Sequence, residues 1–318
     1  MGHTSIKSRI IKAIVLIGLT YCFTGCTASN LTPTESHILP SIDRVKWAAK
    51  KSLLDPCTLI PLAGAALCSI DDFDEKIVDW ADDHHPLFSS RKNASNVSDD
   101  LVDILDMTAW CTAALAPRSE QSTNKEILLD TCQSVGIIAL TGKIGDYNLD
   151  TDKKYFLALA TIGANYFYTV PETQTSKTRL MLTQWLGHEG NSQLTTQIKN
   201  ETNRTRPNGA DDYSFPSGHT SSAFSSAQLA SQNLNHYHFS DRVNFWARTG
   251  LFTLAFGTGW ARVEAYKHYP SDVLFGAALG NFLAAFVSNL LNDTDNENFA
   301  IAISPVNRGL MVSYSFKF

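Results

Sequence analysis

The sequence lacks the compositional extremes of a disordered, collagen-like or coiled-coil chain, since 44% of its residues are apolar and 18% are charged. It has no basic excess, because 26 Lys and Arg face 31 Asp and Glu, so no electrostatic argument favours nucleic acid binding. A mean hydropathy of -0.11 excludes a chain made mostly of membrane spans but leaves one or two open. Its 318 residues suffice for one large domain or two small ones.

The N-terminus has no hydrophobic run long enough to cross a bilayer. A basic start with Lys7, Arg9 and Lys12 precedes an apolar run of 11 residues, from Ala13 to Phe23. The run is typical of the hydrophobic region of a signal peptide. We therefore predict that residues 1–26 are a targeting segment, with an uncleaved anchor as the alternative.

The end of this segment reads Phe23-Thr24-Gly25-Cys26, which resembles the lipobox of bacterial lipoproteins, although Phe23 stands where Leu is usual. The resemblance implies cleavage before Cys26, which becomes a lipidated N-terminus. Acyl chains on Cys26 would tether the protein to a membrane without spanning it. Thr27, where an Asp would favour inner-membrane retention, implies the outer membrane. An ordinary cleaved signal is the alternative.

Cysteine is scarce, and no cysteines have the spacing of a zinc site. With Cys22 in the signal and Cys26 as the lipidation candidate, an even set remains. This set in an oxidising periplasm predicts two disulfides, in any of three pairings, with four buried thiols as the alternative. Its members are Cys57, Cys68, Cys111 and Cys132.

Three regions follow the signal. Residues 27–45, rich in Ser, Thr and Pro, are predicted to be a tether. Residues 46–291 are predicted to be mainly helical, with a break at Gly187 and Gly190. The predicted helices cover 74–88, 99–116, 127–141, 153–168, 176–187, 192–203, 219–233, 242–266 and 270–291.

The last predicted helix and the C-terminus are less polar. Asp272 to Leu291 is nearly long enough to span a bilayer, but Gly276 and Gly280 favour a buried helix packed through small residues. Residues 292–318 are predicted to be a polar linker and a β-hairpin, because apolar and small or polar residues alternate there. The hairpin either covers the helical domain or makes a membrane or assembly contact.

Two short segments suggest an anion site. Lys199 and Arg206 are seven residues apart, which would place both cations on one face of a helix. The run Pro216-Ser217-Gly218-His219 precedes an Ala- and Ser-rich helix, whose exposed amides and dipole favour a phosphate-sized anion beside His219. Taken singly, the two cations are better explained as a solvated basic face, and His219 as a structural histidine.

A third segment adds a candidate nucleophile. Arg262 ends an apolar helix, and His268 lies four residues before Asp272. This spacing lets the carboxylate of Asp272 reach one ring nitrogen of His268. The contact would fix the tautomer, favour the imidazolium and leave the other nitrogen to attack.

The patterns Lys-x6-Arg-Pro, Pro-Ser-Gly-His and Arg-x5-His-x3-Asp occur in this order. Together they resemble the signature of the type 2 phosphatidic acid phosphatase superfamily, which includes bacterial class A acid phosphatases, lipid phosphate phosphatases and vanadium haloperoxidases. The resemblance covers about residues 150–290. It implies an all-α helical bundle of the acid phosphatase and vanadium haloperoxidase type, here with a short C-terminal β-hairpin. Ala261 departs from the Ser often found in the family.

The resemblance also implies a role for each matching residue. The phosphoryl oxygens would be bound by Lys199, Arg206 and Arg262, with Ser217 and the amide of Gly218 completing the cradle. Such charge neutralisation suits phosphoryl transfer, so neither a metal nor another cofactor is expected.

The catalytic roles fall on two histidines and one carboxylate. His268 would attack phosphorus and form a phosphohistidine, and Asp272 would orient it. His219 would protonate the leaving oxygen and then activate the hydrolytic water.

These expectations predict a metal-independent phosphatase of the bacterial envelope, facing the periplasm, that acts on a phosphomonoester or diphosphate. A tethered enzyme would suit a lipid phosphate, and a soluble phosphomonoester is the rival substrate. A vanadate-dependent haloperoxidase and a non-catalytic envelope lipoprotein are the alternative functions.

The acidic residues between Asp71 and His85 are predicted to form a solvated helix face rather than a metal site. His188 is expected in a loop, and Tyr266 and Tyr269 in packing beside His268.

Overall fold

The structure is a computed structural model, and it describes residues 39–40, 42–116, 171–292, 299–306 and 309–316. The chain forms two compact units. One consists of residues 1–45, 123–178 and 294–318, and the other, here called the helical unit, of residues 46–122 and 179–293. The predicted helices 127–141 and 153–168, the signal segment and Cys132 lie outside the described residues.

The first unit contains a small antiparallel sheet with the strand order β1-β2-β3. Its strands are β1 (Leu39–Pro40), β2 (Phe299–Val306) and β3 (Gly309–Phe316). Phe299 pairs with Phe316, and Val306 pairs with Gly309. The short strand β1 lies within the segment that was predicted to be a tether.

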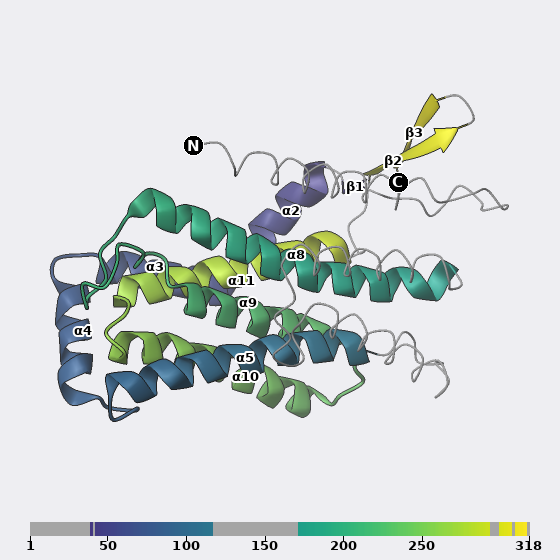
Figure 1. The fold of residues 1–318 in the computed structure, drawn as a ribbon. Coiled ribbons are helices and arrows are strands. Elements are labelled where there is room, and N and C mark those ends of the chain that lie inside the picture. The colour runs from purple at the N-terminus through teal and green to yellow at the C-terminus, as the bar shows by residue number, and fades with distance from the viewer. Residues whose placement is uncertain (1–38, 41, 117–170, 293–298, 307–308, 317–318) are drawn as a thin grey trace, which may run out of the picture. The chain divides into compact units, whose positions relative to one another are not determined.

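Every regular element in the described part of the helical unit is a helix, which confirms the predicted all-α class for this part of the chain (Figure 1). The helices are α2 (Ile42–Leu53), α3 (Pro56–Cys68), α4 (Phe73–His84), α5 (Arg91–Leu115), α8 (Pro171–Thr202), α9 (Gly218–Asn233), α10 (Asp241–Glu264) and α11 (Pro270–Asn292). The first of them, α2, starts inside the predicted tether. A single 3₁₀ turn, η1 (Leu234–His236), follows α9.

Side-chain caps explain several helix starts. The carboxylate of Asp55 accepts a hydrogen bond from the Cys57 amide at 2.8 Å, and Ser90 Oγ accepts one from the Asn93 amide at 3.2 Å. Because such caps satisfy amides that have no partner inside the helix, α5 begins at Arg91. The sequence pattern placed this start at Asp99.

The predicted break at Gly187 and Gly190 is wrong, because α8 continues through both glycines. A Cβ atom on Gly187 would lie 3.0 Å from Cδ1 of Leu229. This glycine therefore permits close packing of α8 on α9. His188, expected in a loop, also lies within α8.

Helix α11 is long and apolar enough to cross a membrane, but 61% of its most apolar window is buried. It packs against α9 through two glycines. A Cβ atom on Gly276 would lie 2.6 Å from the carbonyl oxygen of Ser217, and one on Gly280 would lie 2.0 Å from that of Ser221. These contacts support the prediction of a buried helix packed through small residues.

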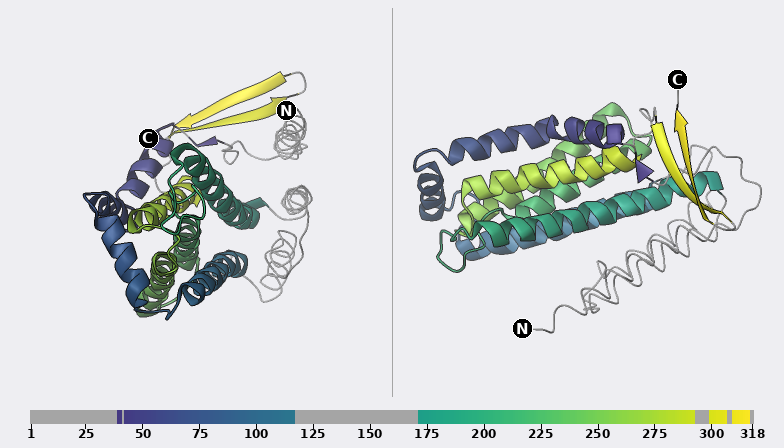
Figure 2. Two further views of the ribbon diagram at one scale, coloured as in Figure 1. Left: turned by 60° about the vertical axis from the view of Figure 1, so that its left-hand side comes forward. Right: turned by 90° about the horizontal axis from the view of Figure 1, so that it is seen from above.

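Several helix ends meet at one end of the helical unit (Figures 1 and 2). Helices α8 and α10 finish there, while α9 and α11 begin there, and α4 crosses the same end. The amide of Ser217 donates to the carbonyl of Asp272 at 3.0 Å and so ties the start of α9 to that of α11. All three sequence motifs are thereby brought to one place.

Candidate active site

The segment after α10 delivers His268 to this end of the unit. The amide of Lys267 donates to the carbonyl of Arg262 at 3.2 Å, and Tyr266 has a positive φ of 56°. These features form a helix-ending motif that usually contains glycine, so a bulky Tyr there is strained. The Tyr266 hydroxyl donates to Asp79 at 2.6 Å, and the guanidinium of Arg91 lies 4.5 Å from its ring centroid. These contacts hold the residue in place.

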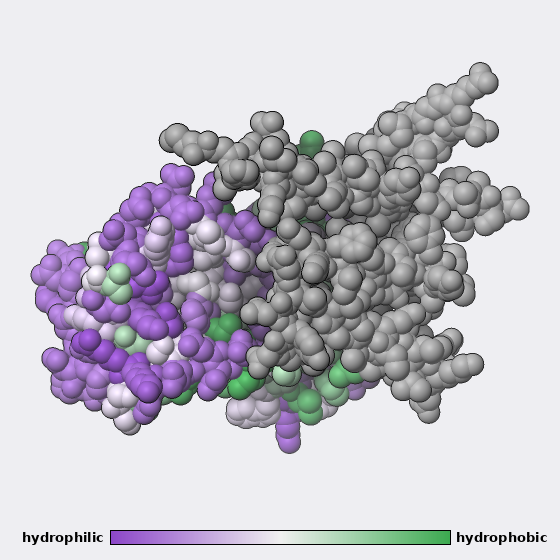
Figure 3. Space-filling model, in the orientation of Figure 1, coloured by the Kyte–Doolittle hydropathy of each residue, from purple (hydrophilic) through white to green (hydrophobic). Residues whose placement is uncertain are grey.

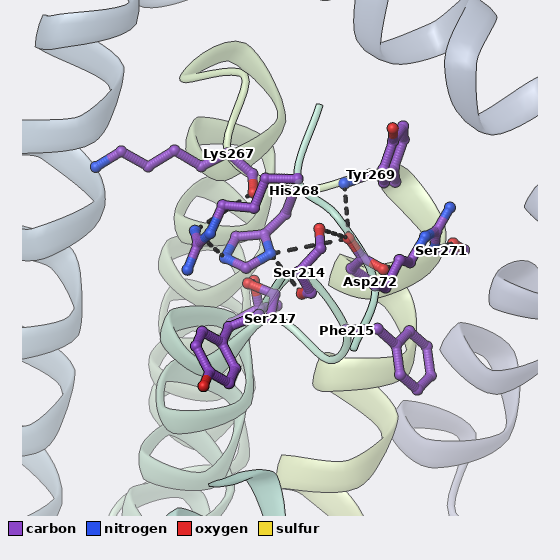
Figure 4. A network of polar contacts seen from close by, with 12 residues as sticks. Ser214, Phe215, Ser217, Lys267, His268, Tyr269, Ser271 and Asp272 are labelled. Carbon is purple, nitrogen blue, oxygen red and sulfur yellow. Dashed lines mark hydrogen bonds and ion pairs between the residues drawn. The ribbon is translucent and has the colours of Figure 1, made fainter. Parts of the chain in front are cut away.

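His268 is 1% exposed, and both of its ring nitrogens have partners (Figure 4). Nδ1 lies 2.7 Å from the backbone carbonyl oxygen of Ser214, while Nε2 lies 3.3 Å from Nη1 of Arg206. A carbonyl only accepts and a guanidinium only donates, so the proton is on Nδ1 and the lone pair is on Nε2. Burial lowers the pKa of His268 to about 3, so the ring is neutral.

The contact predicted between Asp272 and His268 is longer than a hydrogen bond. Oδ2 of Asp272 lies 3.8 Å from Nδ1, because the carbonyl of Ser214 occupies the hydrogen-bonding position. The same carboxylate instead accepts from Ser214 Oγ at 2.5 Å and from the Tyr269 amide at 2.9 Å. Asp272 therefore holds the loop that contains Ser214, and the carbonyl of Ser214 in turn orients the ring of His268. Burial, the largest effect on the pKa of His268, favours the neutral ring, while the charge of Asp272 favours the imidazolium.

Two residues that motif reasoning missed complete this network. Nη1 of Arg204 donates to Asp272 at 2.7 Å, and its Nη2 donates to Asp74 at 2.9 Å. The other oxygen of Asp74 accepts from the amide of Ser271 at 2.8 Å, at the start of α11. Asp74 is 3% exposed, so it departs from the solvated face predicted for residues 71–85. The ring of Tyr269 lies 4.2 Å from the Arg204 guanidinium, consistent with its expected packing role.

Lys199 and Arg206 do not share a helix face, because α8 ends at Thr202. Asn203 ends this helix with a positive φ of 46°, and Arg206 lies in the following loop. The loop folds back, so that Nζ of Lys199 donates to the carbonyl of Tyr213 at 2.6 Å. The two cations therefore converge through the loop rather than through helical spacing.

Arg262 reaches the site from α10. It is 4% exposed, and its Nη1 donates to Ser98 Oγ at 3.1 Å. Its Nε is buried and has no hydrogen-bond partner among the described residues. A buried donor without a partner is costly, so this nitrogen is a candidate contact for a bound anion.

The pKa values show that the cations lie close together. Burial, followed by the charges of Arg206 and then Arg262, lowers the pKa of Lys199 to about 8. Burial, followed by the charge of Arg206, lowers the pKa of Arg262 to about 10. Neighbouring positive charges that lower the pKa values of Lys199 and Arg262 create a site of strong positive potential, which an anion would relieve.

The start of α9 places the second motif beside these cations. A Cβ atom on Gly218 would lie 3.7 Å from Cε of Lys199, so this position adjoins the lysine. The hydroxyl of Ser217 is fully buried and lies 2.9 Å from Thr220 Oγ1. The Ser217 hydroxyl is therefore engaged within the protein in this structure.

His219 has a partner outside the three motifs. Its Nε2 lies 2.8 Å from Oδ1 of Asp99 on α5. Burial, followed by the charge of Arg262, lowers the pKa of His219 to about 4, and Asp99 opposes this shift. A pocket of about 280 Å³ opens beside His219, between α5, α8 and α9. Its wall includes Lys199 and Gly218, with Val102, Asn191, Ser192, Thr195, Thr196 and Ser222.

The remaining candidates do not join this site. No group of three metal-ligating side chains occurs within the described ranges. Cys57, Cys68 and Cys111 are free thiols, so the prediction of two disulfides is wrong for these residues. All three are partly buried.

Comparison with known proteins agrees with the geometry. Residues 168–295 match the family model of the PAP2 superfamily. A curated protein named Lipid A 1-phosphatase, from Porphyromonas gingivalis, is 40% identical over 77 residues. The aligned region is 24% of this chain and 16% of that relative. No solved structure matches the chain.

The region that matches the PAP2 family model contains all eight residues of the predicted phosphate site, from Lys199 to Asp272. Asp74 and Asp99 lie N-terminal to it, on α4 and α5. The helical unit therefore adds two carboxylates to the site from outside the matched region. Neither carries a local sequence signal, since each lies among several other acidic residues.

Proposed function

We propose that this protein is a phosphatase that hydrolyses a phosphomonoester or diphosphate through a phosphohistidine at His268. The observation that carries the proposal is the arrangement around this ring. A buried neutral imidazole has its Nδ1 fixed by the Ser214 carbonyl and its Nε2 beside Arg206. Lys199 and Arg262 lie close enough to that guanidinium for their pKa values to be depressed.

In the first proposed step, the Nε2 lone pair of His268 attacks phosphorus, and the bond to the leaving oxygen breaks. Lys199, Arg206 and Arg262 would neutralise the phosphoryl oxygens, with the amide of Gly218 at the positive end of α9. His219 gives a proton to the leaving oxygen. It then takes a proton from the water that breaks the phosphorus–nitrogen bond, which restores the neutral His268.

The same three cations are the reason why we propose that the reaction needs no metal ion. Phosphoryl transfer depends on positioning and on charge neutralisation, which the two arginines and the lysine would supply. We therefore expect activity in the presence of a metal chelator.

A lipid phosphate is the substrate class that we favour. The relative from P. gingivalis is named for the 1-phosphate of lipid A, although only a small part of it aligns. Large apolar side chains on α10 are exposed, with Phe245, Trp246 and Phe256 each more than 60% exposed. In Figure 3, apolar residues lie along the lower edge of the part of the surface that is coloured by hydropathy, which is otherwise mostly hydrophilic. Such residues suit contact with a membrane surface.

We also propose that Cys26 is lipidated and anchors the protein in the bacterial envelope, at the outer membrane and facing the periplasm. The basic start, the short apolar run and the Phe-Thr-Gly-Cys segment support this proposal. Radiolabelled palmitate should be incorporated into the full chain but not into Cys26→Ala. Equal labelling of both would contradict it.

The decisive test of the enzymatic proposal measures phosphate release in EDTA. The full chain and its His268→Ala, His268→Gln and His84→Ala variants are assayed with p-nitrophenyl phosphate and with phosphatidate in mixed micelles. We expect both His268 variants to lose release from both substrates, while the exposed His84→Ala control retains it. Circular dichroism checks that the variants are folded. Undiminished release by a folded His268→Gln protein would overturn the role of His268.

A further inference from the structure

Asp99 is a carboxylate at the site that no motif predicts. One of its oxygens, Oδ1, lies 2.8 Å from Nε2 of His219 and 3.8 Å from Nη1 of Arg262. Its side chain is 54% exposed, so the carboxylate lies at the mouth of the site rather than in the core. A single carboxylate oxygen therefore lies near both a proposed proton donor and a proposed phosphate-binding cation.

The contact decides which ring nitrogen of His219 remains available. An ionised carboxylate only accepts hydrogen bonds, so Nε2 carries a proton when it is bonded to Asp99. Nδ1 makes no hydrogen bond to any residue that the structure describes. The ring can therefore donate from Nδ1 only when both nitrogens are protonated, as in the imidazolium.

We propose that Asp99 is the counter-ion that stabilises the doubly protonated form of His219, from which Nδ1 gives its proton to the leaving oxygen. The inference rests on the proposed phosphatase function. Asp99 touches neither the phosphoryl group nor the leaving oxygen in this scheme, so it is a positioning residue. The leaving oxygen takes the proton from Nδ1 as its bond to phosphorus breaks. His219 becomes neutral and then recovers a proton from the attacking water.

The charges around His219 explain why a counter-ion is needed. Arg262 on α10 and Lys267 just beyond it both lower the pKa of His219, after the larger effect of burial. Lys199 on α8 lines the same pocket. Asp99 on α5 opposes these effects with its charge and its hydrogen bond. It therefore supplies negative charge before a phosphorylated substrate arrives.

The test compares Asp99→Asn with Asp100→Asn in the full chain. Asn keeps the size of the side chain and an accepting oxygen but removes the charge, and Asp100 is an exposed neighbour on the same helix. Activity is measured on hexyl phosphate, whose leaving oxygen needs a proton, and on p-nitrophenyl phosphate, whose leaving group needs little help. Because general acid catalysis is worth about 10²–10⁴-fold, we expect Asp99→Asn to lose on the order of 10²-fold on hexyl phosphate.

We expect a far smaller loss on p-nitrophenyl phosphate and almost no change in Asp100→Asn. The high-pH limb of the hexyl phosphate profile should move to lower pH in Asp99→Asn, because the imidazolium loses its partner. Equal losses on both substrates with an unshifted profile would overturn the proposal. So would an effect of Asp100→Asn as large as that of Asp99→Asn.

A second measurement does not depend on turnover. The pKa of His219 is followed by NMR titration of the full chain, assigned with His219→Gln, in the wild-type protein and in Asp99→Asn. A lower pKa in Asp99→Asn supports the proposal, and an unchanged value overturns it. If the wild-type protein releases phosphate from no substrate, the phosphatase function fails, while the titration still decides whether Asp99 controls His219.

Discussion

The backbone carbonyl of Ser214 lies 2.7 Å from Nδ1 of His268, closer than the Asp272 carboxylate at 3.8 Å. The tautomer of the candidate nucleophile is therefore set by a loop, and Asp272 acts on it through the Ser214 hydroxyl and through Arg204. A backbone carbonyl cannot be removed by substitution, so the network that holds this loop is the accessible target for experiment.

The first prediction concerns the bridge from Arg204 to Asp74. We expect Asp74→Asn and Arg204→Ala each to lower the free energy of unfolding by about 1–3 kcal/mol, because each leaves a charged partner poorly satisfied. The double variant should lose less than the sum, with a coupling of about 0.5–3 kcal/mol. Urea unfolding of the four proteins measures this cycle.

The ion pair between Asp72 and Lys76 is the matched control. It also involves an aspartate near the start of α4, but its atoms are 3.9 Å apart and its side chains are 79% and 68% exposed. The corresponding cycle should give a coupling of at most about 0.5 kcal/mol. Similar couplings for the two pairs would show that the Asp74–Arg204 bridge has no special structural role.

The second prediction concerns the pH dependence of substrate binding. The pKa of Lys199 is lowered to about 8, so its positive charge is present below that pH and lost above it. We expect KM for a phosphomonoester to rise as the pH passes about 8 in the wild-type protein. Lys199→Arg stays charged throughout this range, so its KM should stay flat. Parallel KM profiles for the two proteins would contradict the role of Lys199 in binding.

The third prediction concerns stability in acid. The pKa of His268 is about 3 in the folded protein and about 6.5 in an unfolded chain, so between these values the unfolded chain binds more protons. Stability should therefore fall as the pH drops from about 6.5 toward 3. His268→Gln cannot titrate, so its free energy of unfolding should depend less on pH across this window. Urea unfolding from pH 7 to pH 4 compares the two slopes, and equal slopes would refute the assignment.

The fourth prediction concerns helix packing. Gly280→Ala places a methyl group against the Ser221 carbonyl, and overpacking of this kind costs about 1–3 kcal/mol. Gly250 lies within α10 with no atom within 4 Å of an added Cβ, so Gly250→Ala should stabilise the protein by up to about 1 kcal/mol. Thermal unfolding should thus move in opposite directions for the two substitutions. A stabilising Gly280→Ala would show that α11 does not approach α9 so closely.

Sequence patterns predicted the helix ends near the site well where capping or helix-breaking residues mark them. The helices that begin near Gly218 and Pro270 and the one that ends near Arg262 were predicted to within a few residues, because caps and breakers mark their ends. The predicted face shared by Lys199 and Arg206 was wrong, since Asn203 ends α8 between them. Helical periodicity cannot show that the chain leaves the helix before Arg206. Nor can it show that the following loop folds back and keeps the Arg206 side chain near Lys199.

Other features had no local signal. Asp74 and Asp99 contact the site only through tertiary packing, and each resembles the exposed acids around it in the sequence. Gly187 looked like a helix breaker, but its lack of a side chain accommodates Leu229 of a neighbouring helix. In each case the partner is far away in the chain, so only the folded structure reveals the reason for the residue.

The meeting of helix ends at the site has a consequence for where the chain tolerates extra residues. Between the second and third motifs, α9 runs away from the site and α10 returns to it (Figure 1). The turn at His238 to Ser240 is exposed and joins these helices at the far end of the helical unit. Extra residues there would lengthen the path without displacing either motif. This turn is therefore a natural attachment point for a tag or an inserted domain.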